Sequence, residues 1–436
     1  VAISPSNKVH HLKILSSARL TAVFVKKIDD STLLIEHNWP INQDIFEDYS
    51  LLLSTDTTYV KIKSIDFDNA TIHLKTPLKD PIKTGAQLSI TAFEEAPILA
   101  ARMMTQTRLA DPFPPIHMRL GTTKATNALL ERTGAKTALI VTKGFKDLLL
   151  IGDQTRPDLF ALSIQKPKVL HEAVFEVDER IDSDGSVEKA LAPDQLNALL
   201  VQLKKQNIVS LAVSLLNSYA NPMHEQQLKE FFSAHFEYIS VSTELFPAIK
   251  YLPRTETAVV NAYLSPIMST YLNNIVQSLG PESNLKIMNS AGALNLPEAY
   301  TAKDSLLSGP AGGIIGAAEI AKTAGFSQCL TLDMGGTSSD VARFEDHFDY
   351  VYETTIGDAH LFAQTLAIET VAAGGGSICS FNGNSLEVGP QSAGAFPGPA
   401  CYGNNGPLAI TDVNLLTGRI VPKHFGMPID LSLIHI

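Results

Sequence analysis

The sequence has 436 residues, of which 45% are hydrophobic and 18% are charged, and its formal net charge is −11. This length and balance predict a globular protein of two or three domains, and an acidic chain without a dense Lys/Arg stripe argues against nucleic acid as a partner. No stretch approaches the ~20 consecutive apolar residues of a membrane span, so we expect no membrane partner.

The cysteines are few and widely spaced, at Cys329, Cys379 and Cys401, and their spacing is not that of a metal site. They indicate reduced thiols in a cytoplasmic protein. The chain opens on Val1 rather than Met and ends on the apolar stretch 431–436, which suggests a fragment at both ends.

The first 94 residues are rich in strand-like runs. Residues 1–17 resemble the end of a hairpin with a turn at 5–7. Short β-branched and aliphatic runs then alternate with polar, Gly and Pro breaks over 18–94, which predicts a small barrel or sandwich. These runs lie at 21–25, 50–53, 60–62, 70–74 and 87–90.

From about residue 95 the pattern changes to alternating helices and strands, which is typical of an α/β domain. We expect strands at 116–120, 137–142, 208–215 and 285–289, and helices at 96–109, 121–132, 194–206, 222–235, 255–279 and 308–324.

The most informative stretch is Leu-Thr-Leu-Asp-Met-Gly-Gly-Thr-Ser-Ser-Asp-Val at 330–341, which predicts a buried strand that ends in a tight turn and doubles back. Gly335 and Gly336 allow positive φ and the close approach of a large anion. Successive amides in such a turn form a concave nest for phosphate oxygens, to which Thr337, Ser338 and Ser339 add hydroxyl donors. The alternative is a plain β-hairpin with a Gly-Gly corner.

Carboxylates flank this turn on both sides. Asp333 would repel a phosphate, so we expect it to hold a divalent cation through water. Asp340 could hold the turn or orient the water shell of the metal.

Two other glycine-rich stretches could serve the same site. Residues 308–313 (Ser-Gly-Pro-Ala-Gly-Gly) open a helix whose dipole favours an anion; the alternative is close helix packing through Gly312, Gly313 and Gly316. Residues 373–377 carry Gly374, Gly375 and Gly376, whose bare backbone could lie against a base or a ribose, or form a mobile loop.

A fourth stretch, 121–127, lies at a strand-to-helix junction. There Thr122, Thr123 and Asn127 could bind a carboxylate or phosphate. The alternative is ordinary helix capping by Thr122 or Thr123. Arg254 is expected to form a salt bridge, with contact to an anionic substrate as the alternative, and Cys401 is expected to be a packed small residue.

With these stretches in view, the chain resembles the hydantoinase A / ATP-dependent 5-oxoprolinase family, and is most similar to its long-chain 5-oxoprolinase type. The similar stretches occur in the family's order over residues 95 to about 426, at 121–132, 142–147, 156–159, 261–266, 308–313, 333–341, 372–377 and 389–402.

The resemblance implies an α/β, actin/hexokinase/Hsp70-like ATPase fold with a β-rich N-terminal insertion. The implied division is 1–17, a remnant of the first ATPase-lobe hairpin; 18–94, the β-rich insertion; 95–300, an α/β lobe; and 301–436, a second ATPase lobe. The family's first phosphate loop would precede Ile3, and its hydantoinase B-like portion would be fused or separate.

The resemblance also implies a reaction, in which ATP phosphorylates 5-oxo-L-proline and water then opens the lactam to L-glutamate. ATP and Mg²⁺ are the implied cofactors. Asp333, Asp340 and Thr337 would be catalytic, with Asp333 on the metal. Gly335, Gly336, Thr337, Ser338, Gly312 and Gly313 would bind phosphates, Gly374, Gly375 and Gly376 the nucleoside, and Thr122, Thr123 and Asn127 the lactam.

Three other functions stay open beside this one. They are an ATP-dependent hydantoinase, an acetone-carboxylase-like subunit, and a nucleotide-gated binding module without a small-molecule substrate. An oligomer is expected in each case.

Overall fold

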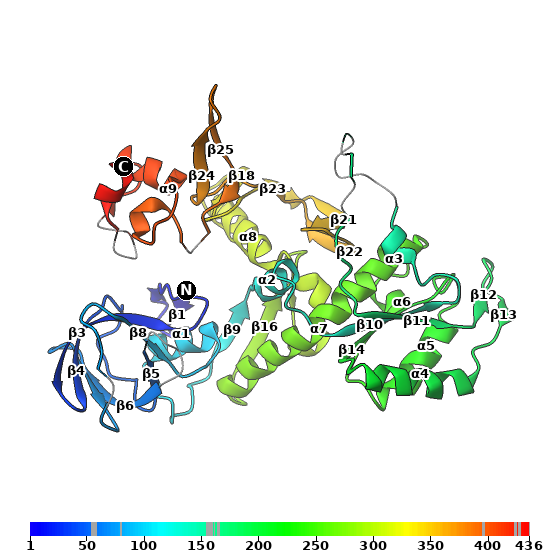
Figure 1. Ribbon diagram of the computed structural model, residues 1–436, viewed down its shortest axis with the longest axis horizontal. Coiled ribbons are helices and arrows are strands. Elements are labelled where there is room, and N and C mark those ends of the chain that lie inside the picture. Colours follow the sequence, from blue (N-terminus) through cyan, green and yellow to red (C-terminus); the bar gives the residue numbers. More distant parts are fainter. Residues whose placement is uncertain are drawn as a thin grey trace. The chain divides into compact units, whose positions relative to one another are not determined.

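A computed structural model describes residues 1–53, 59–78, 81–153, 160, 162–163, 166–394, 397–422, 425 and 429–435 (Figure 1). The chain divides into two compact units: Val1–Leu120 with Ile267–Lys286, and Gly121–Pro266 with Ile287–Ile436. The four-part division expected from the sequence stays a prediction. Among the described residues, no helix combines the length and apolar character that crossing a bilayer requires.

The first unit contains a closed barrel with the strand order β3-β4-β7-β6-β5-β8. Its strands are β3 (Leu20–Asp29), β4 (Thr32–Glu36), β5 (Ser50–Leu52), β6 (Tyr59–Asp66), β7 (Thr71–Leu74) and β8 (Gln87–Thr91). Alternate residues point inward, so that Leu33 and Ile35 of β4 are buried. Of the barrel strands, β4 alone was not predicted, because Thr32–Glu36 is short and directly follows β3.

The remaining elements of this unit agree with the sequence pattern. β1 (Ala2–Ile3) and β2 (Val9–His10) pair antiparallel as the predicted hairpin. They are followed after the barrel by α1 (Ala96–Thr105) and β9 (His117–Leu120), and β9 pairs with β16 (Asn284–Met288). The short strand β17 (Leu294–Asn295) belongs to the second unit.

The second unit begins with α2 (Lys124–Leu130) and a parallel sheet of order β11-β10-β14-β15. The strands are β10 (Thr137–Thr142), β11 (Ala173–Val177), β14 (Ser210–Ser214) and β15 (Tyr238–Val241); a small hairpin, β12 (Arg180–Ile181) and β13 (Val187–Lys189), stands apart. All residues of β10 and β14 are buried, which explains why both read as continuous apolar runs.

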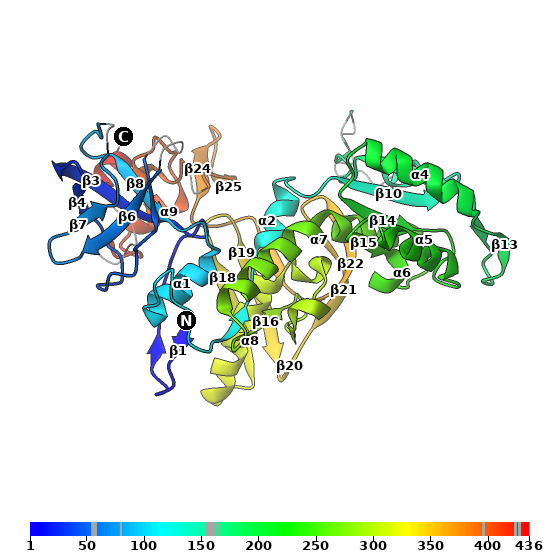
Figure 2. The same ribbon diagram turned by 90° about the horizontal axis from the view of Figure 1, so that it is seen from below.

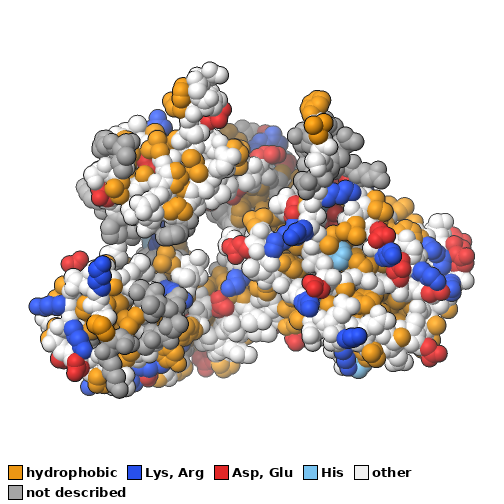
Figure 3. Space-filling view, viewed as in Figure 1, with side chains coloured by type: hydrophobic (Ala, Val, Ile, Leu, Met, Phe, Trp, Pro, Cys, Tyr) orange, Lys and Arg blue, Asp and Glu red, His pale blue; other side chains and the backbone are white. Residues whose placement is uncertain are grey.

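Helices cover both faces of this sheet (Figures 1 and 2). Ile140 and Val213 pack against α4 (Pro193–Lys205) and α5 (Met223–Ser233). Leu139 and Ala212, which point the other way, pack against α7 (Tyr251–Leu279). Short α3 (Leu148–Ile151) and α6 (Ser242–Leu245) follow β10 and β15. Acidic and basic side chains are interspersed over α4 and α5 on the face in Figure 3.

The rest of the second unit is built on α8 (Ser308–Thr323) and a series of hairpins. The remaining strands and helices are β18 (Gln328–Met334), β19 (Ser339–Glu345), β20 (His347–Phe348), β21 (Tyr350–Ile356), β22 (Ala359–Leu366), β23 (Glu369–Val371), β24 (Ser377–Phe381), β25 (Leu386–Ser392), α9 (Ile410–Leu416), and the 3₁₀ turns η1 (Pro297–Ala299), η2 (Ala302–Ser305), η3 (Ala400–Tyr402) and η5 (Leu431–His435).

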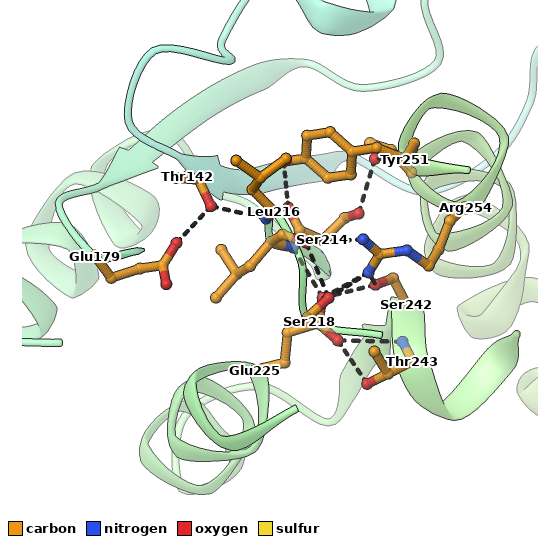
Figure 4. Close-up of polar contacts among 12 residues, drawn as sticks. Thr142, Glu179, Ser214, Leu216, Ser218, Glu225, Ser242, Thr243, Tyr251 and Arg254 are labelled. Carbon is orange, nitrogen blue, oxygen red and sulfur yellow. Dashed lines mark hydrogen bonds and ion pairs between the residues drawn. The ribbon is translucent and has the colours of Figure 1, made fainter. Parts of the chain in front are cut away.

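A buried ion pair joins the carboxyl edge of the parallel sheet to α5 and α7 (Figure 4). The Glu225 carboxylate accepts hydrogen bonds from Leu215 N–H (2.8 Å), Ser218 Oγ (2.9 Å), Ser242 Oγ (2.6 Å) and Thr243 Oγ1 (2.7 Å). Arg254 lies 3.4 Å from Glu225, and its guanidinium also donates to the Leu215 carbonyl at 2.9 Å. Both side chains are fully buried.

Removal of Glu225 should therefore destabilise the second unit strongly. Glu225→Ala leaves the Arg254 cation buried without its counter-ion, which costs about 3–5 kcal/mol of unfolding free energy. Lys229→Ala, on the same helix as Glu225, breaks the exposed ion pair of Lys229 with Glu244 of α6 (2.7 Å) and should cost about 0.5 kcal/mol or less. Urea unfolding followed by circular dichroism measures the free energy of unfolding of the two variants. Equal decreases in this free energy would show that the buried pair stabilises the protein no more than the exposed pair.

Candidate functional site

The predicted turn is the tip of a hairpin formed by β18 and β19. Asp333 pairs with Asp340 and Met334 with Ser339, and Gly335 N–H closes the turn on the Ser338 carbonyl at 2.9 Å. Because residues directly opposite each other in an antiparallel pair share a face, the two aspartates lie on the same side of the hairpin. The strand does end in a tight turn and double back, as predicted.

The prediction that this strand is buried is wrong. Leu330 and Leu332 are 79% and 73% exposed. β18 is an edge strand whose hydrogen-bonded partner among the described strands is β19. The apolar pattern indicated a strand correctly, but its burial depends on whether a second element covers that face.

The two glycine runs at 335–336 and 374–376 lie against each other. Gly375 N–H donates to the Gly335 carbonyl (2.9 Å) and Gly376 N–H to the Gly336 carbonyl (2.6 Å). A Cβ at Gly374 would lie 2.6 Å from Gly336 C and Thr337 N, and one at Gly376 would lie 2.9 Å from Gly336 O. Glycine is required here because backbone packs directly on backbone.

Gly374 and Gly376 are consequently buried, whereas Gly335, Gly336 and Thr337 are exposed. The sequence suggested either a bare surface for a base or a mobile loop at 374–376. The structure shows a further role for these glycines, since they hold the hairpin tip while its outer side stays open to solvent.

Helix α8 lies along the face of the hairpin that carries the aspartates. Lys322, near its C-terminus, stacks over the Phe344 ring at 4.9 Å, and Ala311 and Ile314, nearer its N-terminus, share a core with Ala342. Ala342 is closer to the tip than Phe344, so the N-terminus of α8 points toward the tip. A Cβ at Gly312 or Gly313 meets no described atom within 4 Å, so close helix packing does not explain these glycines within the described chain.

The 121–127 stretch lies against the start of α8. Thr122 N–H donates to Ser308 Oγ at 3.2 Å, and Ser308 Oγ donates to the Thr122 carbonyl at 2.9 Å. Thr122 is buried, and its hydroxyl accepts Lys124 N–H at 3.1 Å, in the manner of the capping role considered from the sequence. Thr123 and Asn127 are exposed.

The sequence did not predict which residues support the glycine run from behind. Thr411 N–H, at the start of α9, donates to the Gly375 carbonyl at 2.7 Å. Ser377 Oγ accepts Gly374 N–H at 2.9 Å, and Ser339 Oγ donates to the Ala373 carbonyl at 2.6 Å. The position of Thr411 at a helix start was its one signal in the sequence. No sequence pattern predicts its hydrogen bond to Gly375, because the two residues are far apart along the chain.

The geometry of the tip suits an anion. Within the described residues, the amides of Gly336 and Thr337 donate no hydrogen bond, so both are available to phosphate oxygens. Asp340 accepts a hydrogen bond from Thr370 Oγ1 at 2.8 Å, which leaves Asp333 as the exposed carboxylate of the pair. The described part of the chain has no cluster of three or more His, Cys, Asp or Glu suited to a metal ion, so a cation here would depend on Asp333, water and the anion itself.

Other residues considered from the sequence have structural roles or lie outside the described part. Arg254 forms the predicted salt bridge in the core, and burial lowers the pKa of its guanidinium. Cys401 is fully buried, and burial together with a hydrogen bond to Asp412 raises the pKa of its thiol to about 12, so it is a packed residue. The stretch 156–159 lies outside the described residues.

Comparisons with known proteins agree with this architecture. A family model described as hydantoinase/oxoprolinase matches residues 254–431, and one described as the hydantoinase/oxoprolinase N-terminal region matches residues 83–236. 5-Oxoprolinase 1 of Arabidopsis thaliana is 41% identical over 332 residues, an alignment that covers 71% of this chain and 26% of that protein. The chain thus spans about a quarter of the length of this relative.

Two solved structures share the fold. ATP-dependent caprolactamase from Pseudomonas jessenii matches with a TM-score of 0.61 and 30% identity, over 72% of this chain and 48% of that one. Nucleotide-free acetone carboxylase matches with a TM-score of 0.60 and 23% identity, over 73% of this chain and 48% of that one. The predicted actin-like ATPase fold with a β-rich N-terminal part is confirmed. The chain belongs to the hydantoinase/oxoprolinase family.

Proposed function

We propose that this chain forms the ATP-binding part of an enzyme that hydrolyses a cyclic amide, with 5-oxo-L-proline as the substrate and L-glutamate as the product. The observation that carries the proposal is the hairpin tip, where unbonded amides of Gly336 and Thr337 stand beside Asp333. The relatives support the reaction class, since they include proteins named 5-oxoprolinase and ATP-dependent caprolactamase.

In this proposal each segment around the tip has a separate task. The backbone at 335–338 binds the phosphates of ATP, and the N-terminus of α8 with Gly312 and Gly313 adds its positive dipole end. Asp333 orients Mg²⁺ through its water shell. Asp340, bonded to Thr370, keeps the second strand in register. Gly375 lines the nucleoside side, and the buried Gly374 and Gly376 set the shape of the loop.

ATP, when bound, would supply the phosphoryl group that activates the amide carbon of the lactam toward attack by water, after which the C–N bond breaks and phosphate is released. We expect the hydroxyl of Thr337 to donate a hydrogen bond to a phosphate oxygen. Exposed Thr123 and Asn127 remain the proposed lactam contacts, whereas the buried Thr122 would position them through Ser308. A hydantoinase B-like portion, an oligomeric assembly and a cytoplasmic location are further parts of the proposal.

The choice of substrate can be tested by phosphate release from the complete protein. With ATP and Mg²⁺ present, 5-oxo-L-proline should stimulate release at least about tenfold, since a bound substrate orients the reacting groups. Stimulation by hydantoins or ketones instead would reassign the substrate. Phosphate release indifferent to every small molecule would favour a nucleotide-gated binding module and overturn the proposal.

The metal role of Asp333 makes a sharper prediction. Asp333→Asn should lower Mg²⁺-dependent phosphate release by about 100-fold or more, because electrostatic stabilisation of the transferring group is a major part of such catalysis. The matched control is Asp349→Asn, on the loop after β20, where the carboxylate pairs with Arg343 at 2.9 Å. ATP binding by equilibrium dialysis with and without Mg²⁺ separates binding from turnover. Wild-type kinetics in Asp333→Asn would reject the metal role.

The glycine contact should matter for both stability and ATP binding. Gly374→Ala forces a Cβ to within 2.7 Å of Gly336 O, and such overpacking costs about 1–3 kcal/mol. We expect a lower melting temperature and weaker ATP binding. Gly316→Ala is the control, because its Cβ meets no described atom within 4 Å on α8 and alanine favours a helix by about 0.5–1 kcal/mol. If both variants bind ATP like the wild type, the loop shape is not required for binding.

A further inference from the structure

A second candidate site lies elsewhere in the second unit, in a pocket of about 940 Å³. Its wall is formed by the end of α3, the 166–170 segment, the first turns of α7, the β21–β22 hairpin and Arg132. Leu149, Leu170, Val259 and Val260 supply apolar surface. Of the described residues that line it, none belongs to the hairpin tip at 335–338 or to the glycine run at 374–376, so this pocket is distinct from the proposed ATP site.

Several basic side chains of this pocket already have acidic or carbonyl partners. Arg132 pairs with Asp358 and donates to the Lys168 carbonyl at 2.8 Å. Lys250 pairs with Glu353 at 2.5 Å. Lys166 Nζ donates to the carbonyls of Ile151 (2.6 Å) and Leu150 (3.2 Å). The side chain of Lys168 is exposed to solvent. Arg132, Lys250 and Lys166 are therefore poorly suited to hold an anion inside the pocket.

Glu256 is a carboxylate of the pocket that is not part of these pairs. Its side chain is 29% exposed, and within the described residues it accepts no hydrogen bond. Its Oε2 lies 3.8 Å from Nδ1 of His360, and Nε2 of the same ring lies 3.9 Å from Glu353. The wall of the pocket thus presents a carboxylate, an imidazole and a second carboxylate in a row. The oxygens of Glu256 can accept further hydrogen bonds.

The environment of Glu256 makes a cationic ligand favourable. Burial, with a smaller contribution from the nearby Asp153 carboxylate, raises the pKa of Glu256 to about 7. A buried carboxylate that lacks a counter-ion gains most from an opposite charge placed beside it. Perturbed acids in a pocket are also typical of ligand sites.

We propose that this pocket binds a small organic molecule through a protonated amino group, which Glu256 receives beside His360 while the apolar wall holds the rest of the molecule. The site needs no ATP and makes no use of the hairpin tip. It therefore goes beyond the proposed reaction and stands or falls independently of it.

The test is a ligand-observed NMR titration of the ATP-free protein with three probes of similar shape: propylammonium, 1-propanol and propionate. Propylammonium should bind at least about tenfold more tightly than 1-propanol, since a hydrogen bond to a charged group is stronger than one between neutral groups. Propionate should bind more weakly than either. Equal binding of the amine and the alcohol, a preference for propionate, or binding of none of the three would overturn the proposal.

A substitution at the carboxylate separates this site from adventitious amine binding. Glu256→Gln keeps the shape and removes the charge, so it should weaken propylammonium binding by about tenfold and leave 1-propanol unchanged. The matched control is Glu188→Gln on β13, an exposed position outside the lining, which should bind like the wild type. Should Glu256→Gln bind the amine normally, the site is elsewhere. If this variant does not fold, the proposal is tested by the binding of propylammonium and 1-propanol to the wild-type protein.

Amine binding should also depend on pH in a defined direction. Glu256 ionises as the pH rises through about 7, so affinity should be about tenfold higher at pH 8 than at pH 6, the ratio of the ionised fractions. The other charged groups that face Glu256 across the pocket are Arg132, Asp153, Lys166, Lys168, Lys250, Glu353 and Asp358. Affinity that is flat or falls with pH would overturn the role of Glu256.

Discussion

The candidate ATP site depends on a contact between two stretches of bare backbone. Gly375 and Gly376 donate their amides to the carbonyls of Gly335 and Gly336, and a side chain at Gly374 or Gly376 would enter the space that Gly336 occupies. Since the inner side of the hairpin tip is used for this contact, its outer amides remain open. The same constraint therefore holds the turn in place and leaves it able to receive an anion.

Segments far apart in the sequence support this contact. Helix α8 covers the aspartate face of the hairpin and points its N-terminus toward the tip, while Thr411 holds the glycine run from the far side. Ser308 ties the start of α8 to Thr122. The stretches that resemble the hydantoinase/oxoprolinase family thus meet through main-chain hydrogen bonds, through the Ser308 side chain and through apolar packing of α8 on the hairpin.

The second unit uses acidic side chains in two different ways. Glu225 is fully buried, accepts several hydrogen bonds and neutralises Arg254, so its bonding capacity is filled and it stabilises the sheet. Glu256 lies two residues beyond Arg254 on the same helix, yet faces a pocket and has one imidazole in ion-pair range. A carboxylate whose acceptor positions are filled by hydrogen bonds has a structural role, whereas one with open positions is available to a ligand.

Local pattern alone was enough to predict much of this protein. The apolar runs at 137–142 and 208–215 formed central strands because a strand covered on both faces must be apolar along its length. The Asp-Met-Gly-Gly sequence formed the predicted tight turn, although neither Gly335 nor Gly336 has the expected positive φ. Tertiary structure decided four other features. They are the exposure of β18, the contact of the 374–376 glycines with 335–336, the hydrogen bonds that hold Arg254, and the proximity of Glu256 to His360. Each depends on which distant segments the topology brings together, and a pattern of neighbours along the chain carries no information on residues about one hundred positions away.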